Sequence, residues 1–122
     1  MLQVLMVDDD PMQLRIREAV LRSAGFIVHV ATNVESALAF LRSMGSKIGV
    51  VVTDHYLPGR TGADLVRELR LTAPSMPVLV LSGMPGIEEE YEGLNVSVQL
   101  KPFPPEKFIR IIRKSLAAGN GH

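Results

Sequence analysis

The sequence predicts one domain of the α/β class, a three-layer αβα arrangement with a five-stranded parallel sheet between two layers of helices. Short apolar runs alternate five times with amphipathic segments along the 122 residues. Repeated strand–helix units form parallel sheets, because right-handed crossovers return each helix to a face of the sheet. We expect the strand order 2-1-3-4-5. Residues 1–118 are assigned to this domain, and 119–122, which are small and polar, to a flexible tail or a cloning remnant.

The strands are predicted from apolar runs that are bounded by polar or turn-forming residues. These runs cover residues 2–7, 26–31, 48–53, 77–81 and 96–100. The third run, IGVVVT, is the richest in β-branched residues, which favour a strand buried on both faces. We therefore place the third strand at the centre of the sheet and the fifth, which is less apolar, near an edge.

Two of the helices are predicted from residues that suit their ends. Asp10 precedes a proline, a favourable pair for the N-cap and the first position of a helix. Gly25 suits the C-terminal end of the same helix. Thr32 and Glu35 have the spacing of a capping box for the second helix, which Gly45 would end. The first strand–helix unit is therefore expected to end at Gly25 and the second at Gly45.

The remaining helices are predicted from apolar residues at helical spacing. The third helix presents Leu65, Val66 and Leu69 on one face. The last helix opens at a Pro-Pro pair and presents Phe108, Ile111, Ile112 and Leu116. The segment between the fourth and fifth strands has few apolar residues and is interrupted by glycines, so any helix there should be short.

The composition excludes several classes of protein. With 13 basic and 13 acidic residues, the chain has no electrostatic basis for generic binding to nucleic acid or to a membrane surface. The absence of cysteine excludes disulfides, zinc–thiolate sites and thiol catalysis. No apolar run approaches the roughly 20 residues that cross a bilayer, and the first residues do not form a secretory signal. We therefore expect a cytoplasmic protein that by itself contacts neither nucleic acid nor membrane.

Chemically active side chains follow four of the five predicted strands. At these strand ends stand Asp8, Asp9 and Asp10, then Asp54, then Ser82, and finally Lys101. Ligand sites of open α/β sheets lie beyond the carboxyl ends of the strands, so we expect these side chains to share one site. Asp10 by itself is explained as the cap of the following helix.

The grouping of acids with a lysine and a hydroxyl points to phosphoryl chemistry. Two carboxylates about 4 Å apart repel by roughly 4 kcal/mol at an effective dielectric constant near 20. Mg²⁺ would relieve this repulsion, because it prefers oxygen ligands. A lysine and a hydroxyl suit the oxygens of a phosphoryl group. The residues thus predict Mg²⁺-dependent phosphoryl transfer, with a carboxylate as a possible nucleophile.

Four motifs, in the order VLMVDDDP, VVTDHYLPGRTG, LVLSG and LKPF, resemble the receiver domain of two-component response regulators. The resemblance extends from about residue 3 to about residue 116, and four motifs in this order and spacing are highly specific. It implies a flavodoxin-like (CheY-like) fold. It also implies a signalling phosphoacceptor rather than an enzyme, with autodephosphorylation as its only catalysis.

The resemblance also implies a role for each site residue. Asp54 would accept a phosphoryl group from phosphohistidine on a histidine kinase or a histidine phosphotransfer protein. Lys101 and Ser82 would bond the oxygens of the transferred group. The implied Mg²⁺ ligands are Asp8, Asp9, Asp54 and the backbone carbonyl of Tyr56. A conformational change would carry the signal to a downstream protein partner or to an effector domain outside these 122 residues.

Several positions need separate comment. Ser82 stands where the family more often has threonine, and serine keeps the hydroxyl group. Val98 stands where an aromatic ring usually moves on activation, and the segment 82–101 is shorter than expected. The Lys101–Pro102 bond matches a position that is often cis in the family. Because side chains alternate along a strand, His55 should point to the opposite side from Asp54. We expect this histidine to be exposed or partner-facing.

Two other functions match parts of the pattern. A degenerate receiver would act as a phosphorylation-independent interaction module, which Val98 and the short segment before Lys101 would favour. A phosphatase of the haloacid dehalogenase type would use Asp8 as its nucleophile. That family needs a late pair of acids, however, and only Glu106 follows Lys101 here. The complete set of site residues favours the phosphoacceptor.

Overall fold

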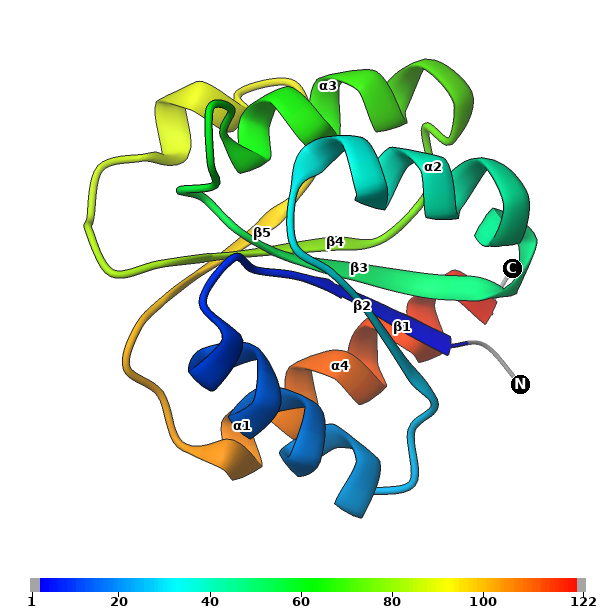
Figure 1. The fold of residues 1–122 in the computed structure, drawn as a ribbon, viewed down its shortest axis with the longest axis vertical. Coiled ribbons are helices and arrows are strands. Elements are labelled where there is room, and N and C mark those ends of the chain that lie inside the picture. The colour runs from blue at the N-terminus through cyan, green and yellow to red at the C-terminus, as the bar shows by residue number, and fades with distance from the viewer. Residues whose placement is uncertain (1–2, 121–122) are drawn as a thin grey trace.

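The computed structural model describes residues 3–120, which form a parallel sheet with helices on both faces (Figure 1). The strands are β1 (Gln3–Val7), β2 (Val28–Ala31), β3 (Ile48–Asp54), β4 (Val78–Ser82) and β5 (Ser97–Leu100). The α-helices are α1 (Pro11–Ser23), α2 (Val34–Met44), α3 (Gly62–Thr72) and α4 (Pro105–Asn120). Two 3-10 helices, η1 (Gly45–Lys47) and η2 (Glu88–Tyr91), complete these elements.

The sheet has the order β2-β1-β3-β4-β5, and all four pairings between neighbouring strands are parallel. This confirms the predicted fold class and strand order. The strand β3 is central and almost wholly buried, while β5 lies at an edge and is only partly buried. Both positions agree with the apolar content of the two sequences, because a central strand must bury both faces.

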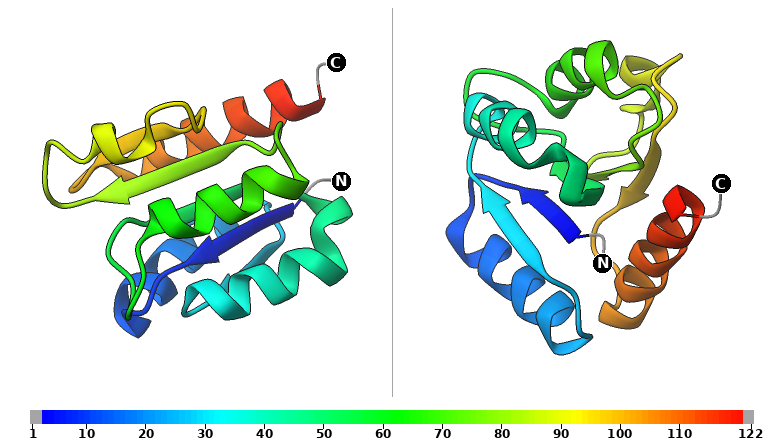
Figure 2. Two further views of the ribbon diagram at one scale, coloured as in Figure 1. Left: turned by 90° about the horizontal axis from the view of Figure 1, so that it is seen from above. Right: turned by 90° about the vertical axis from the view of Figure 1, so that its right-hand side faces the viewer.

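Each face of the sheet is covered by its own pair of helices. Along β1, Val4 and Met6 pack toward α1 and α4, while Leu5 and Val7 pack toward α2 and α3. Alternate residues of a strand point to opposite faces, so one buried strand contributes to two separate cores. Figure 2 shows the sheet between the two helical layers, with α1 and α4 on the same side.

The helix ends agree with most of the predicted caps. The Asp10 side chain accepts bonds from the backbone N–H groups of Met12 and Gln13, and Gly25 has a φ of 95°. The second helix differs from its prediction: its N-cap is Asn33, whose side-chain oxygen accepts from Ser36 at 2.7 Å. The capping box predicted at Thr32 and Glu35 is therefore wrong.

The physical reason is that Glu35 has another partner. Its carboxylate accepts a bond from Arg60 at 3.1 Å, across the loop that leads into α3. A complete capping box is found instead at the start of α3, between Thr61 and Asp64. A capping box needs an acid that is free to bond the backbone at the start of its own helix. Asp64 makes this bond, whereas the Glu35 carboxylate bonds Arg60.

The segment between β4 and β5 contains only the short helix η2, as its weak apolar pattern predicts. Ile87 and Tyr91 are its buried side chains, and they pack into the core beneath α3. At the C-terminus, α4 continues through residues 119 and 120, the first half of the predicted tail. Residues 121–122 of that tail lie outside the described residues, and the domain limit at 118 stays a prediction.

Candidate functional site

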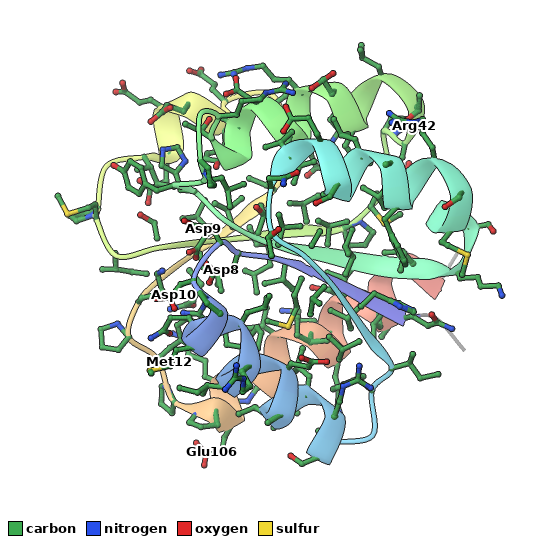
Figure 3. The ribbon with its side chains drawn as sticks, viewed as in Figure 1. Asp8, Asp9, Asp10, Met12, Arg42 and Glu106 are labelled. Carbon is green, nitrogen blue, oxygen red and sulfur yellow. The ribbon has the colours of Figure 1, made fainter. Side chains whose placement is uncertain are left out.

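The parallel register brings the predicted site residues to one edge of the sheet. Val7 lies beside Thr53, Asp54 beside Leu81, and Ser82 beside Leu100. Residues that end these strands therefore meet at the carboxyl edge, as the sequence predicts. Asp8, Asp9 and Asp10 occupy the turn between β1 and α1 at this edge (Figure 3).

Asp54 and Lys101 form an ion pair at this edge. The Lys101 Nζ donates to the Asp54 Oδ1 at 3.0 Å, and the Lys101 backbone N–H donates to the Ser82 carbonyl at 2.7 Å. The second bond fixes the start of the lysine side chain beside the end of β4. The Lys101–Pro102 peptide bond is cis, as the family resemblance implies.

The pKa of Asp54 reflects its position between a cation and an acid. Burial raises the pKa of its carboxyl to about 6, against 3.8 ordinarily. The bond from Lys101 acts in the opposite direction, and the negative charge of Asp8 raises the pKa further. At neutral pH this carboxylate is ionised, although burial makes its charged form unfavourable. A buried carboxylate of this kind is stabilised when it binds a cation or when a reaction removes its charge.

Asp8 is the more deeply buried acid, with 2% of its surface exposed. Its Oδ1 accepts the backbone N–H of Asp10 at 3.0 Å, and its Oδ2 accepts Arg17 Nη1 at 2.9 Å. The first bond holds the turn after β1, and the second brings a helix cation into the site. Both oxygens of this carboxylate are therefore engaged within the chain.

The other expected magnesium ligands are placed differently. Asp9 is exposed, and the Tyr56 side chain is 58% exposed beside the short bridge that Tyr56 makes with Thr61. Within residues 3–120, no group of three His, Asp or Glu side chains lies close enough to hold a metal by side chains alone. The donors fit Mg²⁺ in its usual form, with one or two carboxylates and water filling the remaining positions.

Ser82 is buried at the end of β4, but its hydroxyl bonds within its own turn. It donates to the Met84 carbonyl at 2.8 Å and accepts the Met84 N–H at 3.0 Å. The structure thus brings Ser82 to the same edge as Asp54 and Lys101 without a side-chain bond to either. Val98, on the neighbouring edge strand, is partly buried against the core under α3.

His55 differs from its prediction, since only 2% of its surface is exposed. Its Nδ1 bonds the Tyr91 hydroxyl at 2.7 Å, and its Nε2 lies 3.2 Å from a Glu90 carboxylate oxygen. The expectation of an exposed or partner-facing histidine is wrong, because Glu90 and Tyr91 of η2 lie against this side chain. Burial raises the pKa of Tyr91 well above its usual range, which keeps the hydroxyl protonated at neutral pH.

The Tyr91 hydroxyl also explains the glycine that opens α3. A Cβ on Gly62 would lie 2.7 Å from both the Asp54 carbonyl oxygen and the Tyr91 hydroxyl oxygen. Both distances are far below ordinary contact, so only glycine leaves room for the end of β3 and for Tyr91 together. This glycine therefore has a packing role at the start of α3.

Sequence reasoning missed Arg17, although a signal was present. The side chains buried by α1 are Leu14, Arg17 and Leu21, which form one stripe at helical spacing. An arginine between two leucines of a buried stripe requires an acid within reach. Asp8, one turn before the helix, was the available partner.

Comparison with known proteins settles the family. The family model described as the response regulator receiver domain matches residues 4–113. The chain belongs to this family. The match covers all but the first residue of the sheet, all five strand ends and the first half of α4, and it removes the phosphatase alternative. A receiver domain is a signalling domain of two-component systems, so this part of the prediction is confirmed.

Relatives of the receiver domain give the same result. The cell cycle response regulator CtrA of Brucella ovis is 30% identical over 124 residues, which cover 99% of this chain and 53% of that protein. The chain thus spans about half the length of the curated relatives it matches.

Solved structures share the fold. A response regulator receiver protein from Sinorhizobium medicae is 29% identical, with a TM-score of 0.85 and coverage of 97% of this chain and 96% of that one. The response regulator TrrA of Thermotoga maritima, solved in complex with Mg²⁺ and BeF, is 21% identical, with a TM-score of 0.84. The alignment with TrrA covers 94% of this chain and 99% of the TrrA chain, and at this identity it supports the fold alone. Within the described part of the receiver domain, no helix is long and apolar enough to span a membrane.

Proposed function

We propose that this receiver domain accepts a phosphoryl group on Asp54 and signals through the change that follows. The observation that carries the proposal is the ion pair between Asp54 and Lys101, 3.0 Å apart, beside the buried Asp8. An ionised carboxylate with a raised pKa and an adjacent ammonium group is arranged both to attack phosphorus and to stabilise the product. The donor is phosphohistidine on a histidine kinase or a histidine phosphotransfer protein.

The transfer forms one bond and breaks another. An Asp54 carboxylate oxygen attacks the phosphorus in line with the P–N bond of the phosphohistidine. The P–N bond breaks, its electron pair stays on the imidazole nitrogen, and that nitrogen takes up a proton. Lys101, released from the free carboxylate, then donates to an oxygen of the new acyl phosphate. The Ser82 hydroxyl exchanges its bonds to Met84 for a bond to another phosphoryl oxygen.

The residues that would hold Mg²⁺ are Asp8, Asp9, Asp54 and the backbone carbonyl of Tyr56. A bound Mg²⁺ supplies positive charge to the phosphoryl oxygens as negative charge shifts during transfer. In support, TrrA, a protein of the same fold, was solved with Mg²⁺ and BeF. The acyl phosphate adds about −1.5 to −2 charges at the edge of the sheet. A downstream protein, or an effector domain in a longer chain, would detect the resulting rearrangement.

The test is the mass of the protein after incubation with acetyl phosphate and Mg²⁺. We expect one added phosphate in the wild type and at least a 20-fold loss of labelling in Asp54→Asn, since an amide cannot attack phosphorus. Asp10→Asn is the matched control, because it removes a carboxylate from the same edge while asparagine keeps the helix cap. Undiminished labelling of Asp54→Asn would overturn the assignment of the phosphoacceptor.

A wild type that takes up no phosphate from acetyl phosphate, and shows no spectral change with beryllofluoride and Mg²⁺, would overturn the proposed function. The phosphorylation-independent interaction module would then replace it. Both results are read without knowledge of the cognate kinase.

A further inference from the structure

A buried arginine reaches the magnesium site from the middle of α1. Arg17 lies between Leu14 and Leu21 on the buried stripe of the helix, and 10% of its side chain is exposed. Its Nη1 donates to the Asp8 Oδ2 at 2.9 Å, and its Nη2 donates to the Gln13 Oε1 at 3.2 Å. A cation that is part of the protein therefore already neutralises the most buried acid of the site.

The bond from Arg17 engages the second oxygen of the Asp8 carboxylate. The Asp8 Oδ1 accepts the Asp10 backbone N–H, and its Oδ2 accepts Arg17. A guanidinium and a divalent cation that both approach one carboxylate repel each other, and burial strengthens this repulsion. Full coordination by Asp8 thus requires the guanidinium to share or to leave the carboxylate. The site contains a second cation, Lys101, but this residue is paired with Asp54 and not with Asp8.

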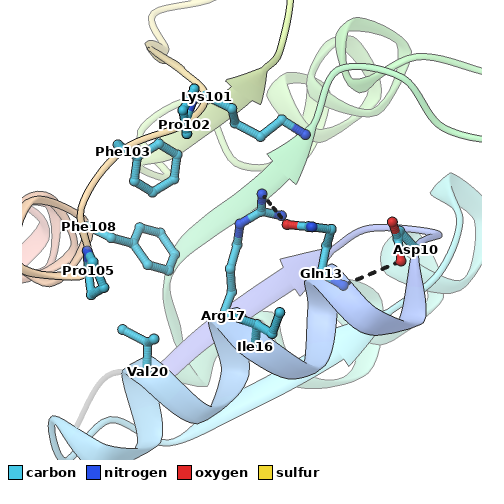
Figure 4. A pocket seen from close by; sticks show the side chains of 10 residues that line it. All are labelled: Asp10, Gln13, Ile16, Arg17, Val20, Lys101, Pro102, Phe103, Pro105 and Phe108. Carbon is cyan, nitrogen blue, oxygen red and sulfur yellow. Dashed lines mark hydrogen bonds between the residues drawn. The ribbon is translucent and has the colours of Figure 1, made fainter.

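The structure also provides space into which the guanidinium could move. A pocket of about 540 Å³ lies between α1 and the chain from Lys101 into α4, and Arg17 is one of its lining residues. Figure 4 shows Arg17 extending from α1 toward the strand ends, with Phe103 and Phe108 on the facing wall. Gln13, on the same helix, accepts a bond from the guanidinium on one side.

We propose that Arg17 is an internal competitor of Mg²⁺ that sets the metal affinity of this receiver domain. In the metal-free protein it stabilises Asp8, and on metal binding it turns away from that carboxylate into the pocket. The proposal rests on the proposed function only in taking Asp8 and Asp54 as metal ligands. Arg17 is a positioning residue here, since it acts on the metal site through Asp8.

The experiment is a calorimetric titration of Mg²⁺ into the wild type, Arg17→Leu and Arg17→Lys. Leucine completes the apolar stripe of α1 and leaves the Asp8 carboxylate without a competing cation. Arg17→Leu should therefore bind Mg²⁺ about 10- to 100-fold more tightly. Arg17→Lys keeps a positive charge on a slightly shorter side chain, so its Mg²⁺ affinity should remain within about threefold of that of the wild type. Arg15→Leu is the matched control, because it removes the same charge from an exposed position of the same helix.

A second readout is the rise in the thermal midpoint with added Mg²⁺. It should be larger in Arg17→Leu than in the wild type, because at a given concentration a ligand that binds the folded state more tightly stabilises that state more. Equal Mg²⁺ affinity of Arg17→Leu, Arg15→Leu and the wild type, with normal labelling by acetyl phosphate, would overturn the competition and leave the phosphoacceptor intact. Absence of both Mg²⁺ binding and labelling in every variant would overturn the proposed function as well.

Discussion

The two acids at the edge of the sheet each bond one cation at nearly the same distance, yet their surroundings differ. Arg17 lies 2.9 Å from Asp8, and the two side chains are 10% and 3% exposed. Lys101 lies 3.0 Å from Asp54, and these side chains are 27% and 12% exposed. The distances are alike, so burial decides what each pair does. The Asp8 pair belongs to the structure of the site, while the Asp54 pair is open to a reactant.

Burial has opposite consequences for breaking the two pairs. A buried charge that loses its partner has no water to replace it, so removal of one partner is costly even where the intact pair contributes little. A partly exposed charge regains some water when its partner is removed. The first pair should therefore resist change, and the second should yield easily to a phosphoryl group. The following predictions test this difference, from the largest effect to the smallest.

The largest effect is expected for Asp8→Ala, which leaves Arg17 buried without its acid. The free energy of unfolding in the absence of Mg²⁺ should fall by about 3–5 kcal/mol, measured by denaturant unfolding. The double variant Asp8→Ala with Arg17→Leu should recover most of this loss, because no unpaired charge then remains in the core. A double variant as unstable as Asp8→Ala would mean that the aspartate acts through its bond to the Asp10 turn instead.

A smaller effect of opposite sign is expected for Asp54→Asn. The folded pKa of Asp54 is about 6 and its ordinary value is 3.8, so between these pH values the folded state binds more protons than the unfolded state. Stability attributable to this group is therefore highest below pH 4 and falls as the pH rises through 6. Above pH 6 the wild type carries the full cost of its ionised carboxylate.

Asparagine removes that cost, so at pH 7.5 Asp54→Asn should be more stable by about 1–2 kcal/mol, after allowance for solvent screening of the pair. The difference should shrink as the pH is lowered from 6 to 4. Thermal unfolding of both proteins in EDTA across this range is the measurement. A stability difference that does not depend on pH would contradict the raised pKa.

The contrast between the two pairs also explains what the sequence could predict. The strand ends follow from apolar runs, so Asp8, Asp54 and Lys101 were placed at one edge without any knowledge of contacts. Arg17 was missed because a charged residue in a helix is normally solvated, and only its place between two buried leucines shows otherwise. Fold and motif are local patterns, whereas a buried ion pair is a relation between two elements.

The same reason accounts for the other differences. The bond between His55 and Tyr91 joins residues 36 positions apart, and η2 has no pattern strong enough to place its tyrosine. At the start of α2, Asn33 is the cap and Glu35 bonds Arg60 instead of completing a capping box. In each case the predicted residue types were suitable, and a tertiary partner decided which of them was used.

The smallest effect on stability is expected for Lys101→Met, which removes the cation of the more open pair while keeping the length of the side chain. The free energy of unfolding at pH 7.5 should change by less than about 1 kcal/mol, since water replaces part of the lost interaction.

The pKa of Asp54 in Lys101→Met should rise further above 6, because the bond from Lys101 is what lowers it in the wild type. Labelling by acetyl phosphate should then require a higher pH in Lys101→Met than in the wild type. A loss of stability as large as that of Asp8→Ala would show that both pairs are structural. An unchanged pH profile would show that Lys101 does not control the charge of Asp54.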